Sequence, residues 1–190
     1  MAGKTGSGKS TLARHLLSTR DFVIVIDTKR DNDWRGFRIA ESVDQCFTLS
    51  QKKPSKAKWI FRPSFGKERL ELNQLFERAY EGKGWHVYVD EGFQIGDLGN
   101  IHSFPPFYVR SLTAGRSRQV TVWTSTQRPV FIPKFALTED YHYFIFELGS
   151  LQDRKALVKT IGIDGLDKPV SGHRFIYYNR GSKRITEMEL

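Results

Sequence analysis

Short runs of apolar, often β-branched residues alternate along the chain with segments whose apolar residues recur every three or four positions. A short continuous apolar run is typical of a strand buried on both faces of a sheet, and the longer spacing is typical of a helix. The predicted strands lie at 22–26, 59–61, 85–89, 120–124 and 141–148. The predicted helices lie at 11–17, 70–79, 107–114 and 152–161, and residues 36–50 are expected to hold a short helix and strand. Two final runs, 174–179 and 185–190, flank Arg180-Gly181-Ser182 and predict a C-terminal β-hairpin.

The alternation of strands and helices predicts an α/β fold with a mainly parallel sheet and helices on both faces. A chain of 190 residues suits one domain, so we expect residues 1–190 to fold as a unit. Apolar residues make up 39% of the chain, which favours a folded core over disorder.

Residues 3–10 read Gly-Lys-Thr-Gly-Ser-Gly-Lys-Ser, which is a complete phosphate-binding loop followed directly by a predicted helix. The glycines let backbone N–H groups point inward around a phosphate, and the positive end of the helix lies beneath it. The lysine brings a point charge to the β- and γ-phosphates of a nucleotide, and the final hydroxyl can ligate Mg²⁺. The residues expected to contact ATP are Gly3, Gly6, Ser7, Gly8, Lys9, Ser10 and Thr11.

The start of this loop departs from the usual pattern. Only Met1 and Ala2 precede Gly3, whereas such a loop normally follows a strand of about five residues. Either the true start lies upstream or the sheet lacks its usual first strand.

Two further strand ends carry polar side chains that suit nucleotide chemistry. Asp90 and Glu91 follow the apolar run at 85–89; Asp90 is expected to hold Mg²⁺, and Glu91 to polarise a water for attack on the γ-phosphate. Gln127 follows the run at 120–124. If that strand lies between the phosphate-loop strand and the acidic strand, the Gln127 amide sits beside the γ-phosphate and can sense hydrolysis or orient water.

The chain carries a formal net charge of +9, which favours a polyanionic partner such as nucleic acid or a membrane surface. Candidate contacts for double-stranded DNA are the loop at 92–107 and the lysines within 52–58, although a solvated surface loop is the more ordinary interpretation of the lysines. A single cysteine, Cys46, rules out an intrachain disulfide and fits a reducing compartment. The longest apolar run is far too short to cross a membrane, so we expect a soluble, cytoplasmic protein.

These residues carry a family resemblance. The chain resembles the FtsK–HerA superfamily of DNA-pumping ATPases, which have a RecA/ASCE-like P-loop fold. Asp27-Thr28-Lys29 resembles its Asp-Pro-Lys, with Thr28 in place of proline, and Asp90-Glu91 matches its acidic pair. Thr126-Gln127-Arg128-Pro129 resembles its sensor strand end, and Ser150 with Asp153-Arg154 resembles a further segment less closely. A motor core of this size is most similar to the genome-packaging ATPases of membrane-containing, tailless double-stranded DNA viruses.

The resemblance implies ATP and Mg²⁺ as cofactors, double-stranded DNA as partner and a homo-oligomeric ring, most often a hexamer. Arg116 falls where the family carries an arginine that reaches into the neighbouring subunit, and Arg118 is the reserve candidate. Capsid or membrane-vertex proteins would be further partners, in the host cytoplasm or at a virion vertex. Two other functions remain open from the residues: a P-loop kinase for a small molecule, and a filamentous-phage-type assembly ATPase. The Gln127 strand end and Glu91 count against the kinase, and the lack of a membrane span counts against the assembly protein.

Overall fold

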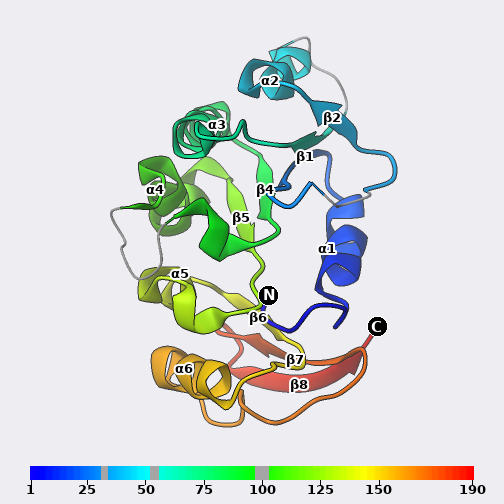
Figure 1. Ribbon diagram of the computed structural model, residues 1–190, viewed down its shortest axis with the longest axis vertical. Helices are drawn as coiled ribbons and strands as arrows, with labels where there is room; N and C mark the ends of the chain where they lie inside the picture. Colours follow the sequence, from blue (N-terminus) through cyan, green and yellow to red (C-terminus); the bar gives the residue numbers. More distant parts are fainter. Residues whose placement is uncertain (31–33, 52–55, 97–102) are drawn as a thin grey trace.

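The computed structural model describes residues 1–30, 34–51, 56–96 and 103–190 (Figure 1). The strands are β1 (Phe22–Ile26), β2 (Arg38–Ala40), β3 (Ala57–Phe61), β4 (His86–Val89), β5 (Thr121–Thr124), β6 (His142–Ile145), β7 (Arg174–Asn179) and β8 (Arg184–Glu189). The helices are α1 (Lys9–Ser18), α2 (Val43–Gln51), α3 (Glu68–Gly82), α4 (Pro106–Ala114), α5 (Lys134–Thr138) and α6 (Leu151–Ile161). The predicted elements are therefore present, with ends that differ by a few residues.

A five-stranded sheet in the order β2-β3-β1-β4-β5 forms the larger part of the molecule, and all its pairings are parallel. This confirms the predicted α/β class. The register aligns Ile26 of β1 with Phe61 of β3 and with Val89 of β4, and Val89 in turn with Thr124 of β5. Because the strands end level with one another, the residues that follow them lie together at one edge of the sheet.

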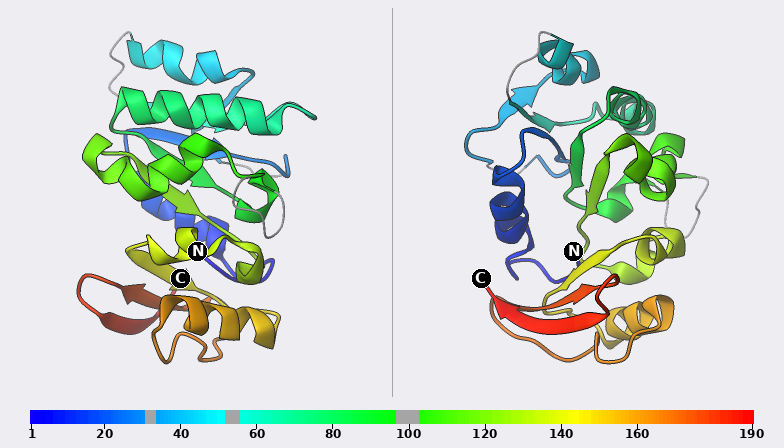
Figure 2. Two further views of the ribbon diagram at one scale, coloured as in Figure 1. Left: turned by 90° about the vertical axis from the view of Figure 1, so that its left-hand side faces the viewer. Right: turned by 180° about the vertical axis from the view of Figure 1, so that it is seen from behind.

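Helices cover both faces of this sheet, as the alternating pattern predicts (Figures 1 and 2). On one face, α1 packs Ala13 and Leu17 against Val23 and Val25 of β1. On the other face, apolar side chains of α2, α3 and α4 pack with the alternate residues of the same strands. Successive residues of a strand point to opposite faces, so a strand covered on both sides is apolar throughout, which is why these runs are readable in the sequence.

β5 differs from the prediction that residues 120–124 form a buried strand. Its residues are exposed or half-buried. β5 is the last full strand of the five-stranded sheet, and among the described residues only the first ones of the chain pair with its carboxyl end, through a bridge between Ala2 and Thr126. A cavity of about 600 Å³ lies between β5 and β6, which leaves the rest of the strand edge uncovered.

A second, three-stranded sheet in the order β6-β7-β8 is antiparallel, and it contains the predicted C-terminal hairpin. The predicted strand at 141–148 is shorter than expected and pairs with β7. Ala2 joins the two sheets, because it also bridges Ile145, donating its N–H to the carbonyl of Phe144 and accepting from the N–H of Phe146. The phosphate-binding loop therefore begins at the seam between the sheets (Figure 1).

Among the residues described, no helix has the length and apolar character needed to cross a membrane.

Candidate active site

The phosphate-binding loop is curled by two glycines with left-handed backbone conformations. Gly6 has a φ of 74° and Gly8 a φ of 104°, a region that other residues rarely adopt. Because Gly8 makes the turn, α1 begins at Lys9, two residues earlier than predicted. The helix start has no side-chain cap and no acidic residue in its first turn, so its N–H groups and positive dipole end are available to an anion.

Lys9 lies folded into the loop and is only 8% exposed. Its ammonium donates to the carbonyls of Gly3 at 2.7 Å and Lys4 at 2.8 Å. Burial lowers the pKa of Lys9 to about 8, with the negative charges of Glu91 and Asp90 opposing the shift and the positive charge of Lys29 adding to it. A phosphate bound in the loop would supply the counter-charge that the ammonium lacks.

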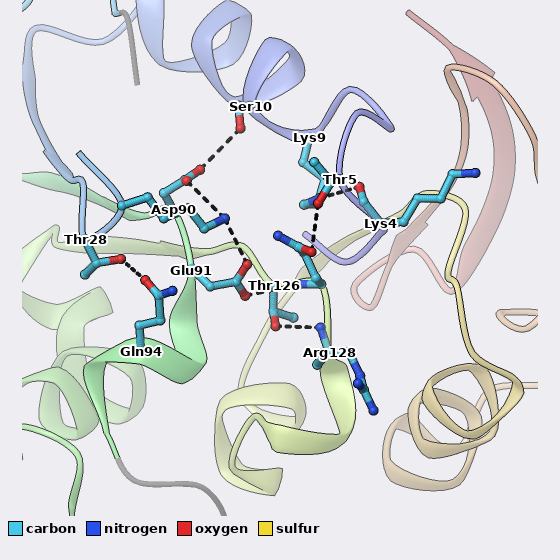
Figure 3. A network of polar contacts seen from close by, with 12 residues as sticks. Lys4, Thr5, Lys9, Ser10, Thr28, Asp90, Glu91, Gln94, Thr126 and Arg128 are labelled. Atoms are coloured by element: carbon cyan, nitrogen blue, oxygen red, sulfur yellow. Dashed lines mark hydrogen bonds and ion pairs between the residues drawn. The ribbon is translucent and has the colours of Figure 1, made fainter. Parts of the chain in front are cut away.

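Asp90, predicted to hold Mg²⁺, lies directly opposite the start of α1 (Figure 3). Its Oδ1 accepts a hydrogen bond from Ser10 Oγ at 3.2 Å and from the hydroxyl of Tyr88 at 3.1 Å. The hydroxyl at the start of α1 and the carboxylate after β4 are thus in contact. One or two hard oxygen ligands from the protein suit an Mg²⁺ that also binds nucleotide phosphates. The donor set therefore fits Mg²⁺ held by Ser10 and Asp90.

Glu91, the predicted base, is fully buried. Its Oε1 accepts from the backbone N–H of Gln127 at 3.1 Å, and its Oε2 lies 3.3 Å from the ammonium of Lys29. Gln127 in turn accepts at Oε1 from Thr5 Oγ1, at 2.9 Å. One network of contacts therefore runs from the phosphate-binding loop through Gln127 to Glu91.

The role expected for Gln127 requires its strand to lie between the acidic strand and the segment that leads into the phosphate-binding loop, and β5 lies there. β5 lies beside β4 in the sheet, and Thr126 after β5 bridges Ala2 before the loop. Gln127 consequently lies between the acidic strand and the phosphate-binding loop, beside the place expected for a γ-phosphate.

The segment after Gln127 is anchored to the second sheet's helix α6 by a buried carboxylate. Asp153 is 1% exposed and accepts from Arg128 Nε at 3.0 Å and from the backbone N–H of Val130 at 3.2 Å. Ser150 caps the same helix by accepting from the N–H of Gln152 at 3.1 Å. Of the pattern singled out in the sequence, Asp153 therefore anchors the segment that follows Gln127, and Ser150 caps the helix that carries Asp153.

Arg116 does not join this site. It is exposed on a 3₁₀ turn, Gly115–Arg118, that precedes β5, so it lies at the opposite end of that strand from Gln127. Its guanidinium lies 5.9 Å from the ring centre of Tyr141, and that of the reserve candidate Arg118 lies 5.4 Å from the ring centre of Tyr80.

Sequence reasoning assigned no role to Lys29 or Thr5, which the structure places in the site. The signals for Lys29 were its position after a buried strand and the resemblance of Asp27-Thr28-Lys29 to the Asp-Pro-Lys of the FtsK–HerA superfamily. Asp27 is fully buried, accepts from the N–H of Arg30 at 2.9 Å and pairs with Arg62 Nε at 3.0 Å. This pair fixes the turn that presents Lys29.

The predicted DNA contacts fall partly outside the described residues. Residues 97–102 of the loop at 92–107, and Lys52 and Lys53 of the lysine group, are not described. Of the described part, Gly92–Ile95 forms a 3₁₀ turn, Lys56 directly precedes β3, and Lys58 is the second residue of that strand.

Comparison with known proteins decides the family. The chain is 32% identical over 166 residues to the DNA packaging ATPase P9 of Enterobacteria phage PRD1, covering 85% of this chain and 69% of that protein. The chain belongs to this family of viral DNA-packaging ATPases.

Solved structures of a packaging ATPase agree with the family in fold. The genome packaging NTPase B204 from Sulfolobus turreted icosahedral virus 2, in complex with sulfate, matches with a TM-score of 0.82 and 16% identity, over 99% of this chain and 93% of that one. The same protein in complex with AMPPCP matches with a TM-score of 0.78 and 17% identity, over 99% and 94%. No protein-family model matches the chain.

Proposed function

We propose that this packaging ATPase couples ATP hydrolysis to the translocation of double-stranded DNA during viral genome packaging. The observation that carries the proposal is the single network in which Thr5 of the phosphate-binding loop, Gln127 and Glu91 are linked. It provides what a hydrolytic motor needs: a phosphate site, a base for water, and a residue that contacts both. The identity to a phage DNA packaging ATPase supports DNA as the cargo.

In the proposed reaction, residues 3–11 hold the phosphates, with Lys9 at the β- and γ-phosphates. The Glu91 carboxylate accepts a proton from water as the water oxygen bonds to the γ-phosphorus and the bond to the ADP oxygen breaks. Gln127 contacts the γ-phosphate and transmits its loss to the strand end held by Asp153. When bound, Mg²⁺ neutralises charge on the phosphates, and Ser10 and Asp90 are the residues that would hold it.

We further propose that the active form is a ring, most simply a hexamer, in which Arg116 completes the site of a neighbouring subunit. The position of Arg116 supports this. Arg116 is exposed and lies at the end of β5 remote from the ATP site of its own subunit, so it can extend towards the ATP site of a neighbouring subunit. An arginine supplied in trans stabilises the charge of the transition state only when the neighbour is correctly placed. Packaging would take place in the host cytoplasm or at a virion vertex, with capsid or membrane-vertex proteins as partners.

The test is ATP hydrolysis measured with and without long duplex DNA. We expect duplex DNA to raise the rate, and Glu91→Gln to keep nucleotide binding while slowing hydrolysis by about 10²–10⁴-fold. Lys9→Ala should lose tight ATP binding. Turnover that requires a nucleoside or metabolite, and ignores DNA, would instead identify a small-molecule kinase.

A further inference from the structure

The carboxylate of Glu91 is held from both sides by the strands that flank its own. Glu91 follows β4, whose neighbours in the sheet are β1 and β5. Gln127 after β5 donates its backbone N–H to Oε1 at 3.1 Å, and Lys29 after β1 brings its ammonium to 3.3 Å from Oε2. Each carboxylate oxygen of Glu91 therefore contacts a different donor. Together the two contacts fix the plane of this fully buried carboxylate.

Lys29 is itself presented by a fixed turn. Buried Asp27, two residues earlier, is paired with Arg62 and accepts the N–H of Arg30, which closes the turn around Lys29. The hydroxyl of Thr28 donates to Gln94, in the 3₁₀ turn that follows Glu91 (Figure 3). The side chain of Lys29 is only 27% exposed, and its ammonium is also 3.9 Å from Asp90 Oδ2.

A general base must meet the attacking water within about 3 Å and in the right orientation, and a misplacement of 1 Å can cost about 100-fold in rate. A buried carboxylate that loses one of two fixed donors is free to rotate, and its charge loses its nearest counter-ion. We propose that Lys29 is a positioning residue for ATP hydrolysis, holding Oε2 of Glu91 in the orientation from which Glu91 acts on water. The proposal rests on the role of Glu91 given above.

Lys29→Met tests this, because methionine keeps the aliphatic stem and removes the donor and the charge. We expect the single-turnover hydrolysis rate at saturating ATP to fall by about 10- to 100-fold, with the Kd of a non-hydrolysable ATP analogue changed less than about twofold. Lys29→Arg, which retains a cationic donor, should recover a large part of the rate. Lys155→Met, which removes an exposed lysine on α6, controls for the loss of net charge and should hydrolyse ATP normally. Thermal unfolding of each variant shows whether it folds.

The double variant separates this inference from the proposed function. If Lys29 acts through Glu91, adding Lys29→Met to Glu91→Gln should cost little further rate. If Glu91→Gln hydrolyses ATP slowly but Lys29→Met hydrolyses it at the wild-type rate, the inference about Lys29 is overturned, and Glu91 keeps its proposed role as base. A Glu91→Gln that hydrolyses ATP at the wild-type rate overturns the base assignment itself. A Lys29→Met whose Kd weakens in step with its rate, or a Lys29→Arg with no recovery, also overturns the inference.

Discussion

Nucleotide binding should depend on pH through Lys9. Burial lowers its pKa in the free protein from 10.5 to about 8, so above pH 8 the side chain is mostly neutral before a nucleotide binds. Bound phosphates favour the charged form and return the pKa towards its ordinary value. Binding above pH 8 must therefore take up a proton, and affinity should fall as the pH rises.

The magnitude follows from the same values. At pH 9.5 only about 3% of free Lys9 carries its proton, so the Kd of a non-hydrolysable ATP analogue should be roughly 30-fold weaker than at pH 7, provided that the pKa in the complex is near 10.5. The shift also affects stability. Above pH 10.5 Lys9 is neutral in both the folded and the unfolded protein, so the lowered pKa does not change the free energy of unfolding. As the pH falls from 10.5 to about 8 the free energy of unfolding decreases, and below pH 8 it is lower by about 3 kcal/mol. Phosphate binding offsets this cost.

Titration calorimetry at pH 7 and 9.5, in pairs of buffers with different ionisation enthalpies, measures both affinity and proton uptake. We expect almost no uptake at pH 7 and close to one proton at pH 9.5. Burial places the pKa of the N-terminal ammonium at about 6 and that of Cys46 at about 12, so neither titrates in this interval. Lys9→Arg, charged throughout, should show no such dependence on pH. Equal affinity at both values without proton uptake would refute the reasoning.

Three further predictions concern the ring, the anchor of the Gln127 segment and the cargo. Arg116→Ala and Lys9→Ala subunits should each be inactive but recover some ATP turnover when mixed; no recovery in rings shown to contain both, or full activity of Arg116→Ala alone, would exclude Arg116. Asp153→Ala should lower the free energy of unfolding by about 2–3 kcal/mol, because it removes a buried carboxylate that accepts hydrogen bonds from the N–H of Val130 and from Arg128. Ser150→Ala, which removes only a helix cap, should cost about 1 kcal/mol by denaturant titration, and a loss no larger in Asp153→Ala would contradict the anchor. Duplex binding should weaken steeply between low and physiological salt through counter-ion release, and an affinity indifferent to salt would count against a groove that tracks phosphates.

The elements that were easiest to predict are those in which local pattern and tertiary burial agree. β1 and β4 are covered on both faces, so Phe22–Ile26 and the three residues 87–89 are apolar throughout, and the strand ends at Asp27 and Asp90 are sharply marked. The phosphate-binding loop is predictable because its chemistry depends on nearby residues in a fixed order.

The remaining features depend on pairings that connect distant parts of the chain. β5 has the composition of a buried strand, but its burial depends on what lies beside it, and in the described part of the chain the segment beside its end is the short stretch around Ala2. The placement of 142–145 in a separate antiparallel sheet depends on β7, more than thirty residues away in sequence. The contact between Lys29 and Glu91 joins residues 62 positions apart, and it follows from the adjacency of β1 and β4, which no local pattern encodes.

ATP-dependent release of a triplex-forming oligonucleotide from long duplex DNA tests the central claim most directly, since a motor moving along the duplex strips the third strand from its path. The account predicts release by the wild-type chain with ATP, and none with a non-hydrolysable analogue, with Glu91→Gln or with Lys9→Ala. ATP hydrolysis by the wild-type chain on the same duplex without release of the third strand would contradict it.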